Sequence, residues 1–162
     1  MAIRMAAAAA SLLLFASPAT AVTPGVGAQV SDTTFTTAYG QSLSMADLRG
    51  QVVVLTYWTS HCEPCDEQLK ALDYYYRQRH DMGLRVLVVS ADDLTDRQLR
   101  ATFKGKLIHP VYSIRGPFEP ARSFPTTYII NRNGQVQHVL SEALGIARLN
   151  ELLVPLLKQP QP

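Results

Sequence analysis

The sequence has little net charge and no clustering of charge of one sign. It carries 15 lysines and arginines against 13 aspartates and glutamates among 162 residues, for a formal charge of +2. The basic residues are scattered and not interleaved with aromatic residues, which removes the usual basis for binding nucleic acid or an anionic membrane surface. With 47% hydrophobic residues the composition is that of an ordinary globular protein, and the length suits one domain.

Cysteine is equally scarce, since the chain has only two, Cys62 and Cys65. No second cysteine pair and no Cys/His cluster completes the four ligands of a structural zinc site, which argues against zinc. Long apolar runs are also absent after Ala21, because none approaches the roughly 20 residues that span a bilayer.

The first residues have the pattern of a secretory signal peptide. Arg4 supplies a positive charge, Met5 to Phe15 form a short apolar stretch, and residues 19–21, Ala-Thr-Ala, present the small-x-small pattern of a cleavage site. We expect cleavage after Ala21, which gives a soluble periplasmic or otherwise extracytoplasmic protein in a compartment that permits disulfides. An uncleaved membrane anchor is the alternative, although the apolar stretch is shorter than the ~20 residues of a membrane span.

Hydrophobic periodicity predicts an α/β fold with a mixed central sheet flanked by helices. The run from Gln51 to Trp58 is nearly all apolar or β-branched, as in a strand buried on both faces. A helix after Cys65 leads to a second such run, which makes a parallel βαβ unit. The expected order is a leader (22–40), a capped turn (44–50), a strand (51–58), a helix ending before Gly83, a strand (84–90), a helix opened by a capping box at Thr95, a loop-rich stretch (105–120), a hairpin (126–140) and an amphipathic helix (149–157). One domain over residues 41–162 follows.

The two cysteines lie where the predicted buried strand turns into the predicted helix. A helix N-terminus presents unpaired N–H groups and the positive end of the helix dipole, and both favour a thiolate over a thiol. The thiolate is the species that attacks disulfides. Cys62, at or just before the first turn, is therefore expected to be the exposed nucleophile. Cys65, one turn further, is expected to be the shielded resolving thiol.

Two other uses of the pair need weighing. A purely structural disulfide across so short a loop would gain only about 2 kcal/mol, and a domain of this size does not need it. A metal site is the second use, because His61, Cys62 and Cys65 offer three ligands of a type that suits copper(I). A copper(I)-binding chaperone is thus the alternative to an enzyme.

Two segments resemble the thioredoxin superfamily, specifically its exported TlpA/ResA-like branch. Residues 52–65, VVVLTYWTSHCEPC, are similar to the family's apolar strand, aromatic-Trp pair and Cys-x-x-Cys motif. Residues 124–134, FPTTYIINRNG, are similar to its Pro-Thr-Thr-aromatic strand and hairpin turn. The resemblance implies a thioredoxin-like fold, disulfide exchange with no cofactor beyond the cysteine pair, a cis proline at Pro125 facing the cysteines, and substrate contacts from Trp58 and Phe124.

The chain departs from the family pattern at three positions around the cysteines. His61 stands where the family usually has tryptophan, Thr56 where thioredoxin has a buried acid, and Gln68 where ResA-like members have a glutamate. Glu67 is adjacent to the last position but is turned by about 100° around a helix, so we do not expect it to substitute. Proton transfer at the second cysteine is then left to water, His61 or Glu63.

The residues beside the cysteines, His61, Glu63 and Pro64, are expected to tune the pair and to favour a reductase. At ~7 Å and an effective dielectric of ~40, the Glu63 carboxylate disfavours the Cys62 thiolate by about 1 kcal/mol. This makes the dithiol a better reductant. His61 opposes this effect of Glu63 only when its ring is protonated. Glu63 and Pro64 form the Glu-Pro linker that ResA-like proteins also carry. The resemblance implies disulfide-containing exported proteins as substrates, apocytochrome c among them, and a membrane or periplasmic electron donor.

Overall fold

A seven-stranded β-sheet forms the centre of the computed structural model, which describes residues 23–30, 32–120 and 123–160. The expected signal peptide, residues 1–21, lies outside the described residues. The strands follow the order β2-β1-β5-β4-β3-β6-β7 across the sheet. The elements are β1 Thr34–Thr37, β2 Ser42–Ser44, β3 Val52–Trp58, α1 Glu63–Arg79, the 3₁₀-helix η1 His80–Met82, β4 Leu84–Ser90, α2 Asp96–Thr102, β5 His109–Arg115, β6 Thr126–Ile130, β7 Val136–Leu140 and α3 Ile146–Leu157.

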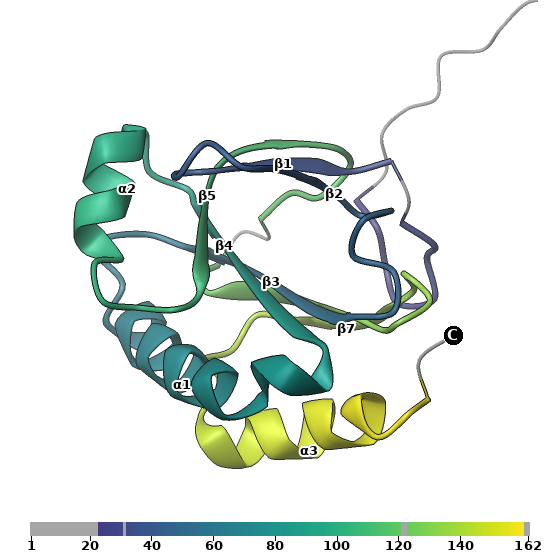
Figure 1. Cartoon of the computed structure of the whole chain (residues 1–162). Helices are drawn as coiled ribbons and strands as arrows, with labels where there is room; N and C mark the ends of the chain where they lie inside the picture. The colour runs from purple at the N-terminus through teal and green to yellow at the C-terminus, as the bar shows by residue number, and fades with distance from the viewer. Residues whose placement is uncertain (1–22, 31, 121–122, 161–162) are drawn as a thin grey trace, which may run out of the picture.

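The sheet contains both parallel and antiparallel neighbours. Strands β3, β4 and β5 run parallel to one another, and the crossovers between them contain α1 and α2. Strand β6 pairs antiparallel with β3 and β7, and β1 pairs antiparallel with β2 and β5. Helices α1 and α3 lie together against one side of this sheet (Figure 1). The predicted α/β fold with a mixed, helix-flanked sheet is confirmed.

Strand β3 is buried on both faces, as its composition predicts. All seven of its residues are buried, and the six apolar ones are divided between two hydrophobic clusters on opposite faces. Val54 and Trp58 belong to the cluster beneath α1 and α3, whereas Leu55 and Tyr57 belong to the cluster on the opposite face. The segment that follows β3 therefore leaves the sheet at its centre, between β4 and β6.

Helices α1 and α2 begin at the residues that the sequence signals indicate, whereas α3 begins at Ile146, three residues before the expected start. Helix α1 has Pro64 in its first turn, where a missing N–H costs nothing, and it buries a stripe through Leu69 and Leu72. Helix α2 begins with the predicted capping box between Thr95 and Gln98. Among the described residues, no helix combines the length and the apolar character that crossing a membrane requires.

Three strands, β1, β2 and β5, are not predicted from the sequence. Residues 22–40, expected as a surface leader, contain β1, which pairs with β2 and β5 and buries Phe35 completely. The fold therefore begins before residue 41. Residues 105–120, expected as a loop, contain β5, in which Pro110 pairs with β4. Both regions are rich in glycine and proline, and β1 is too short to show a clear period.

A buried arginine joins several segments at the end of the sheet where β3 and β4 begin. Arg132 is 4% exposed, and its guanidinium donates to the main-chain oxygens of Gly50, Met82 and Leu157. Gly50 and Met82 come just before β3 and β4, and Leu157 ends α3. Hydrogen bonds from an ionised donor are stronger than neutral ones, so the Arg132 clamp fixes this end of the molecule.

Candidate active site

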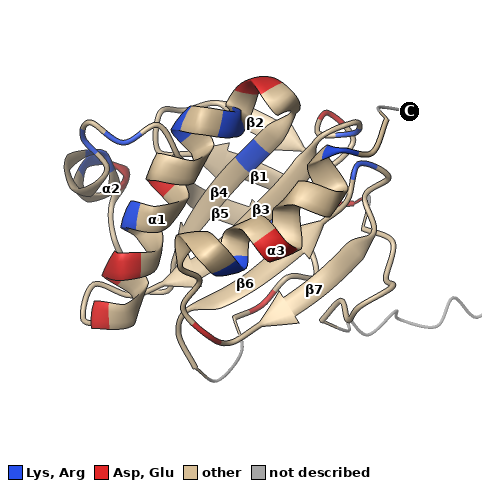
Figure 2. Cartoon of the chain, turned by 90° about the horizontal axis from the view of Figure 1, so that it is seen from below, with Lys and Arg blue, Asp and Glu red and all other residues tan. Residues whose placement is uncertain are grey.

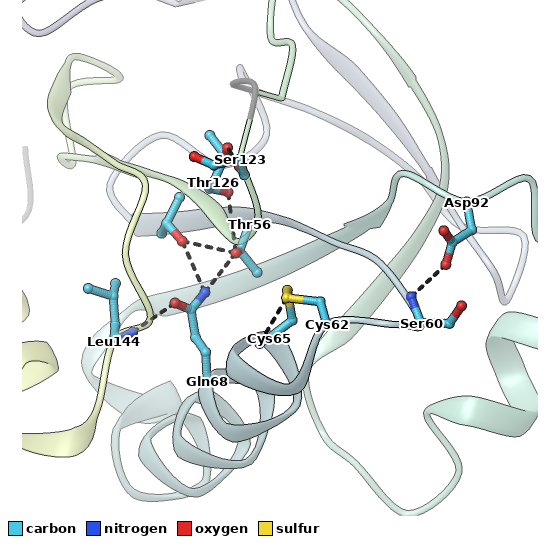
Figure 3. Close-up of a disulfide and its surroundings, with 10 residues drawn as sticks. Thr56, Ser60, Cys62, Cys65, Gln68, Asp92, Ser123, Thr126 and Leu144 are labelled. Atoms are coloured by element: carbon cyan, nitrogen blue, oxygen red, sulfur yellow. Dashed lines mark hydrogen bonds between the residues drawn. A yellow bond between two sulfur atoms is a disulfide. The ribbon is translucent and has the colours of Figure 1, made fainter.

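The sulfur atoms of Cys62 and Cys65 form a disulfide at the N-terminus of α1 (Figure 3). Cys62 is the N-cap residue, and its Sγ accepts a hydrogen bond from the main-chain N–H of Cys65 at 3.2 Å. Cys62 is half-buried whereas Cys65 is fully buried. An approaching thiol or disulfide therefore reaches Cys62 first, which is what the roles of nucleophile and resolving thiol require.

Charge along α1 follows the helix dipole. Glu63 and Asp66 lie in the first turn, and Arg77 and Arg79 lie in the last. In Figure 2 red residues accordingly mark one end of α1 and blue residues the other. The acids stabilise the helix through its dipole, but their negative charge opposes a thiolate at Cys62. Because Glu63 and Asp66 are exposed, solvent weakens both effects.

An acid that the sequence analysis did not select anchors the segment before the disulfide. The Asp92 carboxylate, from the loop after β4, accepts a hydrogen bond from the main-chain N–H of Ser60 at 2.6 Å (Figure 3). The main-chain N–H of Ala91 also donates to the oxygen of Trp58 at 2.8 Å. Parallel strands bring their carboxyl ends to one edge of a sheet. The position of Asp92 after a strand parallel to the cysteine strand is the signal that could have found it.

A buried network of uncharged polar groups lies beneath the disulfide. Gln68 donates through Nε2 to the hydroxyl oxygens of Thr56 at 2.8 Å and Thr127 at 3.0 Å, and its Oε1 accepts from the main-chain N–H of Leu144 at 2.8 Å. These contacts join α1, β3, β6 and the segment before α3 (Figure 3). Thr56 and Gln68 are the positions where the family pattern carries acids. Both positions depart from the family pattern in sequence, but their connection to each other appears only in the folded chain.

The peptide bond between Phe124 and Pro125 is cis, which confirms the geometry implied by the resemblance. Strand β6 begins at the next residue, Thr126, which pairs with Tyr57 near the end of β3. Pro125 is therefore at the same end of the sheet as the segment that leads to the cysteines. Phe124 is half-buried and contacts the hydrophobic clusters on both faces.

The expected role of Trp58 in contacting substrate needs correction. Its side chain is 3% exposed, belongs to the cluster beneath α1 and α3, and packs edge-on against Phe103 with ring centroids 5.6 Å apart. A ring buried in this way has no free face for a substrate. Trp58 instead supports the end of β3 from below.

The metal ligands considered from the sequence do not form a cluster in the structure. Within residues 23–30, 32–120 and 123–160, no group of three or more His, Cys, Asp and Glu side chains is placed to hold a metal ion. The exposed His61 ring has its Nδ1 3.0 Å from the hydroxyl of Ser60.

The sheet order, the disulfide at the start of α1 and the cis proline together define a protein of the thioredoxin-like class. The chain belongs to the AhpC/TSA family, whose sequence pattern matches residues 26–113. A DsbF homologue from Corynebacterium diphtheriae has a similar fold, with a TM-score of 0.69, 22% identity, and 90% of this chain and all of that chain covered. A secreted thiol-disulfide isomerase from Corynebacterium glutamicum also has a TM-score of 0.69, with 18% identity and 81% and 86% coverage.

Two thiol-disulfide oxidoreductases named ResA are similar to this chain in sequence. The thiol-disulfide oxidoreductase ResA of Oceanobacillus iheyensis is 28% identical over 123 residues, which cover 69% of this chain and 60% of that protein. The chain thus spans about three fifths of the length of this relative, and a second ResA, from Halalkalibacterium halodurans, is covered to 59%.

Proposed function

We propose that this protein is an exported thiol–disulfide oxidoreductase that reduces disulfides in other exported proteins through Cys62 and Cys65. The observation that carries the proposal is the unequal burial of a bonded cysteine pair at a helix N-cap. The half-buried Cys62 has the N–H of Cys65 directed at its sulfur. Together with the helix dipole, this hydrogen bond stabilises negative charge on Cys62 after reduction.

The reaction consists of two exchanges. In the reduced protein, the Cys62 thiolate attacks one sulfur of a substrate disulfide; a bond forms between them, and the second substrate sulfur leaves with the electron pair and takes up a proton. The Cys65 sulfur then attacks Cys62 Sγ and displaces the remaining substrate sulfur, so that the substrate gains two electrons and the Cys62–Cys65 disulfide forms. A membrane or periplasmic electron donor must reduce this disulfide before the next turnover.

The surroundings of the cysteines support the proposed reductive direction and an extended protein segment as the substrate. The exposed Glu63 carboxylate opposes the Cys62 thiolate, and a dithiol with a disfavoured thiolate is the stronger reductant. Phe124, beside the cis proline, offers main-chain groups for pairing with an extended substrate segment. The name of the ResA relatives, thiol-disulfide oxidoreductase, supports the same reaction. Apocytochrome c is the exported substrate that we propose to test first.

The test is the reduction of insulin disulfides by the protein with dithiothreitol as the electron source. Wild-type protein is expected to accelerate the reduction, and Cys62→Ser is expected to abolish the acceleration because no nucleophile remains. Binding of copper(I) without any insulin reduction would contradict the proposal and favour the chaperone. A matched assay on an oxidised haem-binding Cys-x-x-Cys-His peptide tests the choice of substrate.

A further inference from the structure

The buried network beneath the disulfide is closed to solvent. Thr56 and Thr127 are 0% exposed and Gln68 is 1% exposed. Gln68 follows Cys65 by three residues on α1, so that the two side chains share one face of the helix. Figure 3 shows both directed toward β3, with Gln68 and the disulfide on either side of Thr56.

The Gln68 amide is held in one orientation. A main-chain N–H can only donate, so the group that meets Leu144 N at 2.8 Å must be the amide oxygen. The NH₂ group is then directed at the hydroxyl oxygens of Thr56 and Thr127 at 2.8 Å and 3.0 Å. Both amide hydrogens are thereby used, and an inverted amide would set its NH₂ group against the Leu144 N–H, where two donors would meet.

One arrangement of donors and acceptors at the two threonine hydroxyls completes the network. Their oxygens lie 2.9 Å apart, and the Thr56 hydroxyl also lies 3.4 Å from the main-chain oxygen of Thr126. Each hydroxyl has one hydrogen to donate. The arrangement that uses both has Thr127 donating to Thr56, and Thr56 donating to the carbonyl of Thr126. The chain of donors therefore ends at a carbonyl and contains only amide and alcohol groups, which neither gain nor lose a proton near neutral pH.

The elements around this network carry titratable groups that do not take part in it. They are His61, Glu63, Asp66 and Glu67 before and on α1, Asp92 after β4, His138 on β7 and Glu142 before Leu144. All are exposed or half-buried, and burial lowers the pKa of His138, which favours its neutral form. In the described part of the chain, none of them forms a hydrogen bond with the amide or the two hydroxyls.

We propose that Gln68 is a positioning residue for Cys65: its amide holds a neutral hydrogen-bond network behind the buried resolving thiol, so that Cys65 exchanges its proton only on the side of the half-buried Cys62. This inference rests on the proposed disulfide exchange. In the release step the Cys65 S–H bond breaks and, because Cys65 itself is buried, its proton reaches water only past Cys62. The Cys65–Cys62 bond forms as the bond between Cys62 and the substrate sulfur breaks, and the substrate sulfur leaves with the electron pair. No group inside the protein takes up the proton.

The test separates the two exchanges with 5,5′-dithiobis(2-nitrobenzoate) as the disulfide. Reduced protein releases one thionitrobenzoate when Cys62 attacks, at a rate that depends on reagent concentration, and a second when Cys65 resolves, at a rate that does not. The second rate is followed from pH 5 to pH 10. For wild type we expect a rise of about tenfold per pH unit that levels off at a single ionisation, that of Cys65.

Gln68→Glu is the decisive variant. Burial raises the pKa of a carboxyl group, so the new acid is expected to add a second ionisation between about pH 5 and pH 8. Above it, the buried negative charge should slow the second release by about five- to tenfold relative to wild type. Gln78→Glu, the same change at an exposed position of α1, is the matched control and should keep the wild-type profile. Gln68→Met, which is neutral, should keep a single ionisation.

Three outcomes overturn the inference. A purely structural role predicts that Gln68→Glu and Gln68→Met change the rate by factors that do not vary with pH. An inner proton acceptor predicts a second ionisation in wild type that persists in a His61→Ala/Glu63→Gln variant, and this measurement decides the matter even if Gln68→Glu does not fold. If Gln78→Glu changed the pH profile of the second release as much as Gln68→Glu, the effect would not be local to Gln68, which also contradicts the inference. Loss of the first release in wild type would instead refute the proposed function itself.

Discussion

The Asp92 carboxylate and the main-chain N–H of Ser60 are joined by a hydrogen bond of 2.6 Å. Asp92 itself is held in place, because its own N–H donates to the hydroxyl of Ser90 at 3.1 Å. The loop after β4 thereby supports the turn that carries the nucleophile from a neighbouring strand. Removing the carboxylate leaves the Ser60 segment attached only at its two ends.

Asp92→Ala is expected to lower the free energy of unfolding by about 1 kcal/mol and to slow insulin reduction about threefold, because the turn before Cys62 loses a fixed position. Urea unfolding and the insulin assay measure the two effects. Asp92→Asn keeps an oxygen acceptor and should recover most of the stability. The neighbouring Asp93 is exposed, so Asp93→Ala is the control, and an equal loss in that variant would show that charge rather than the hydrogen bond matters.

Cys65→Ser is expected to accumulate a covalent mixed disulfide through Cys62. Attack by Cys62 is retained, but the buried side chain that would displace the substrate is lost. Mass spectrometry under non-reducing conditions should find the adduct in Cys65→Ser and not in wild type or Cys62→Ser. Normal turnover by Cys65→Ser would show that the two cysteines have been assigned the wrong roles.

Glu63→Gln is expected to make the pair more oxidising. The Glu63 charge disfavours the thiolate by about 1 kcal/mol, and its removal corresponds to a change in reduction potential of about 20 mV for a two-electron couple. Equilibration with glutathione measures the potential. A wild-type potential close to about −120 mV, that of a strong oxidant, would contradict the reductase assignment.

The stability of the protein should fall as the pH drops below about 6.5, in part because of His109. Burial, followed by the Arg85 charge, lowers the pKa of His109. Arg85 donates to Nε2 at 2.8 Å, so that Nε2 is unprotonated and Nδ1–H donates to the oxygen of Val86 at 3.1 Å. Since the folded-state pKa lies below the unfolded value, the unfolded chain binds the proton more readily and acid favours unfolding.

His109→Gln should therefore reduce the difference in unfolding free energy between pH 7 and pH 5, even if it lowers stability at pH 7. Urea unfolding at the two pH values gives this difference directly. Equal differences in wild type and His109→Gln would mean that other groups account for the acid sensitivity.

The extent to which the fold could be predicted depends on how clear the local pattern of each element is. Strands β3 and β4 and helix α1 have seven or more residues each and show a hydrophobic pattern and a defined start. Strand β5 also has seven residues, but its sequence HPVYSIR contains a proline and no regular alternation of apolar and polar residues. Strand β1 has four residues and β2 has three, and their place in the sheet comes from the pairing of β1 with β5 and of β2 with β1 rather than from local sequence. The Arg132 clamp could not be predicted from local sequence either, because its three acceptors are main-chain oxygens.

The residues of the candidate site also fall into those that the sequence marks and those that it does not. Cys62, Cys65 and Pro125 are marked by residue type and local motif, so their placement could be expected. The partners of Gln68 are separated from it by 12 residues for Thr56, 59 for Thr127 and 76 for Leu144. Only the folded chain brings those groups together, and a glutamine within a helix carries no signal of such contacts.

The Arg132 clamp lies at the opposite end of β3 from the disulfide. Because it joins the starts of β3 and β4 to the end of α3, none of its hydrogen bonds involves the turn at Cys62 or the segment at Phe124. Amide hydrogen exchange should therefore be slower beside Gly50 and Met82 than around His61 and Ser123, at the other end of the sheet. The protein would then accommodate its partner by a local hinge, with the far end serving as a fixed base.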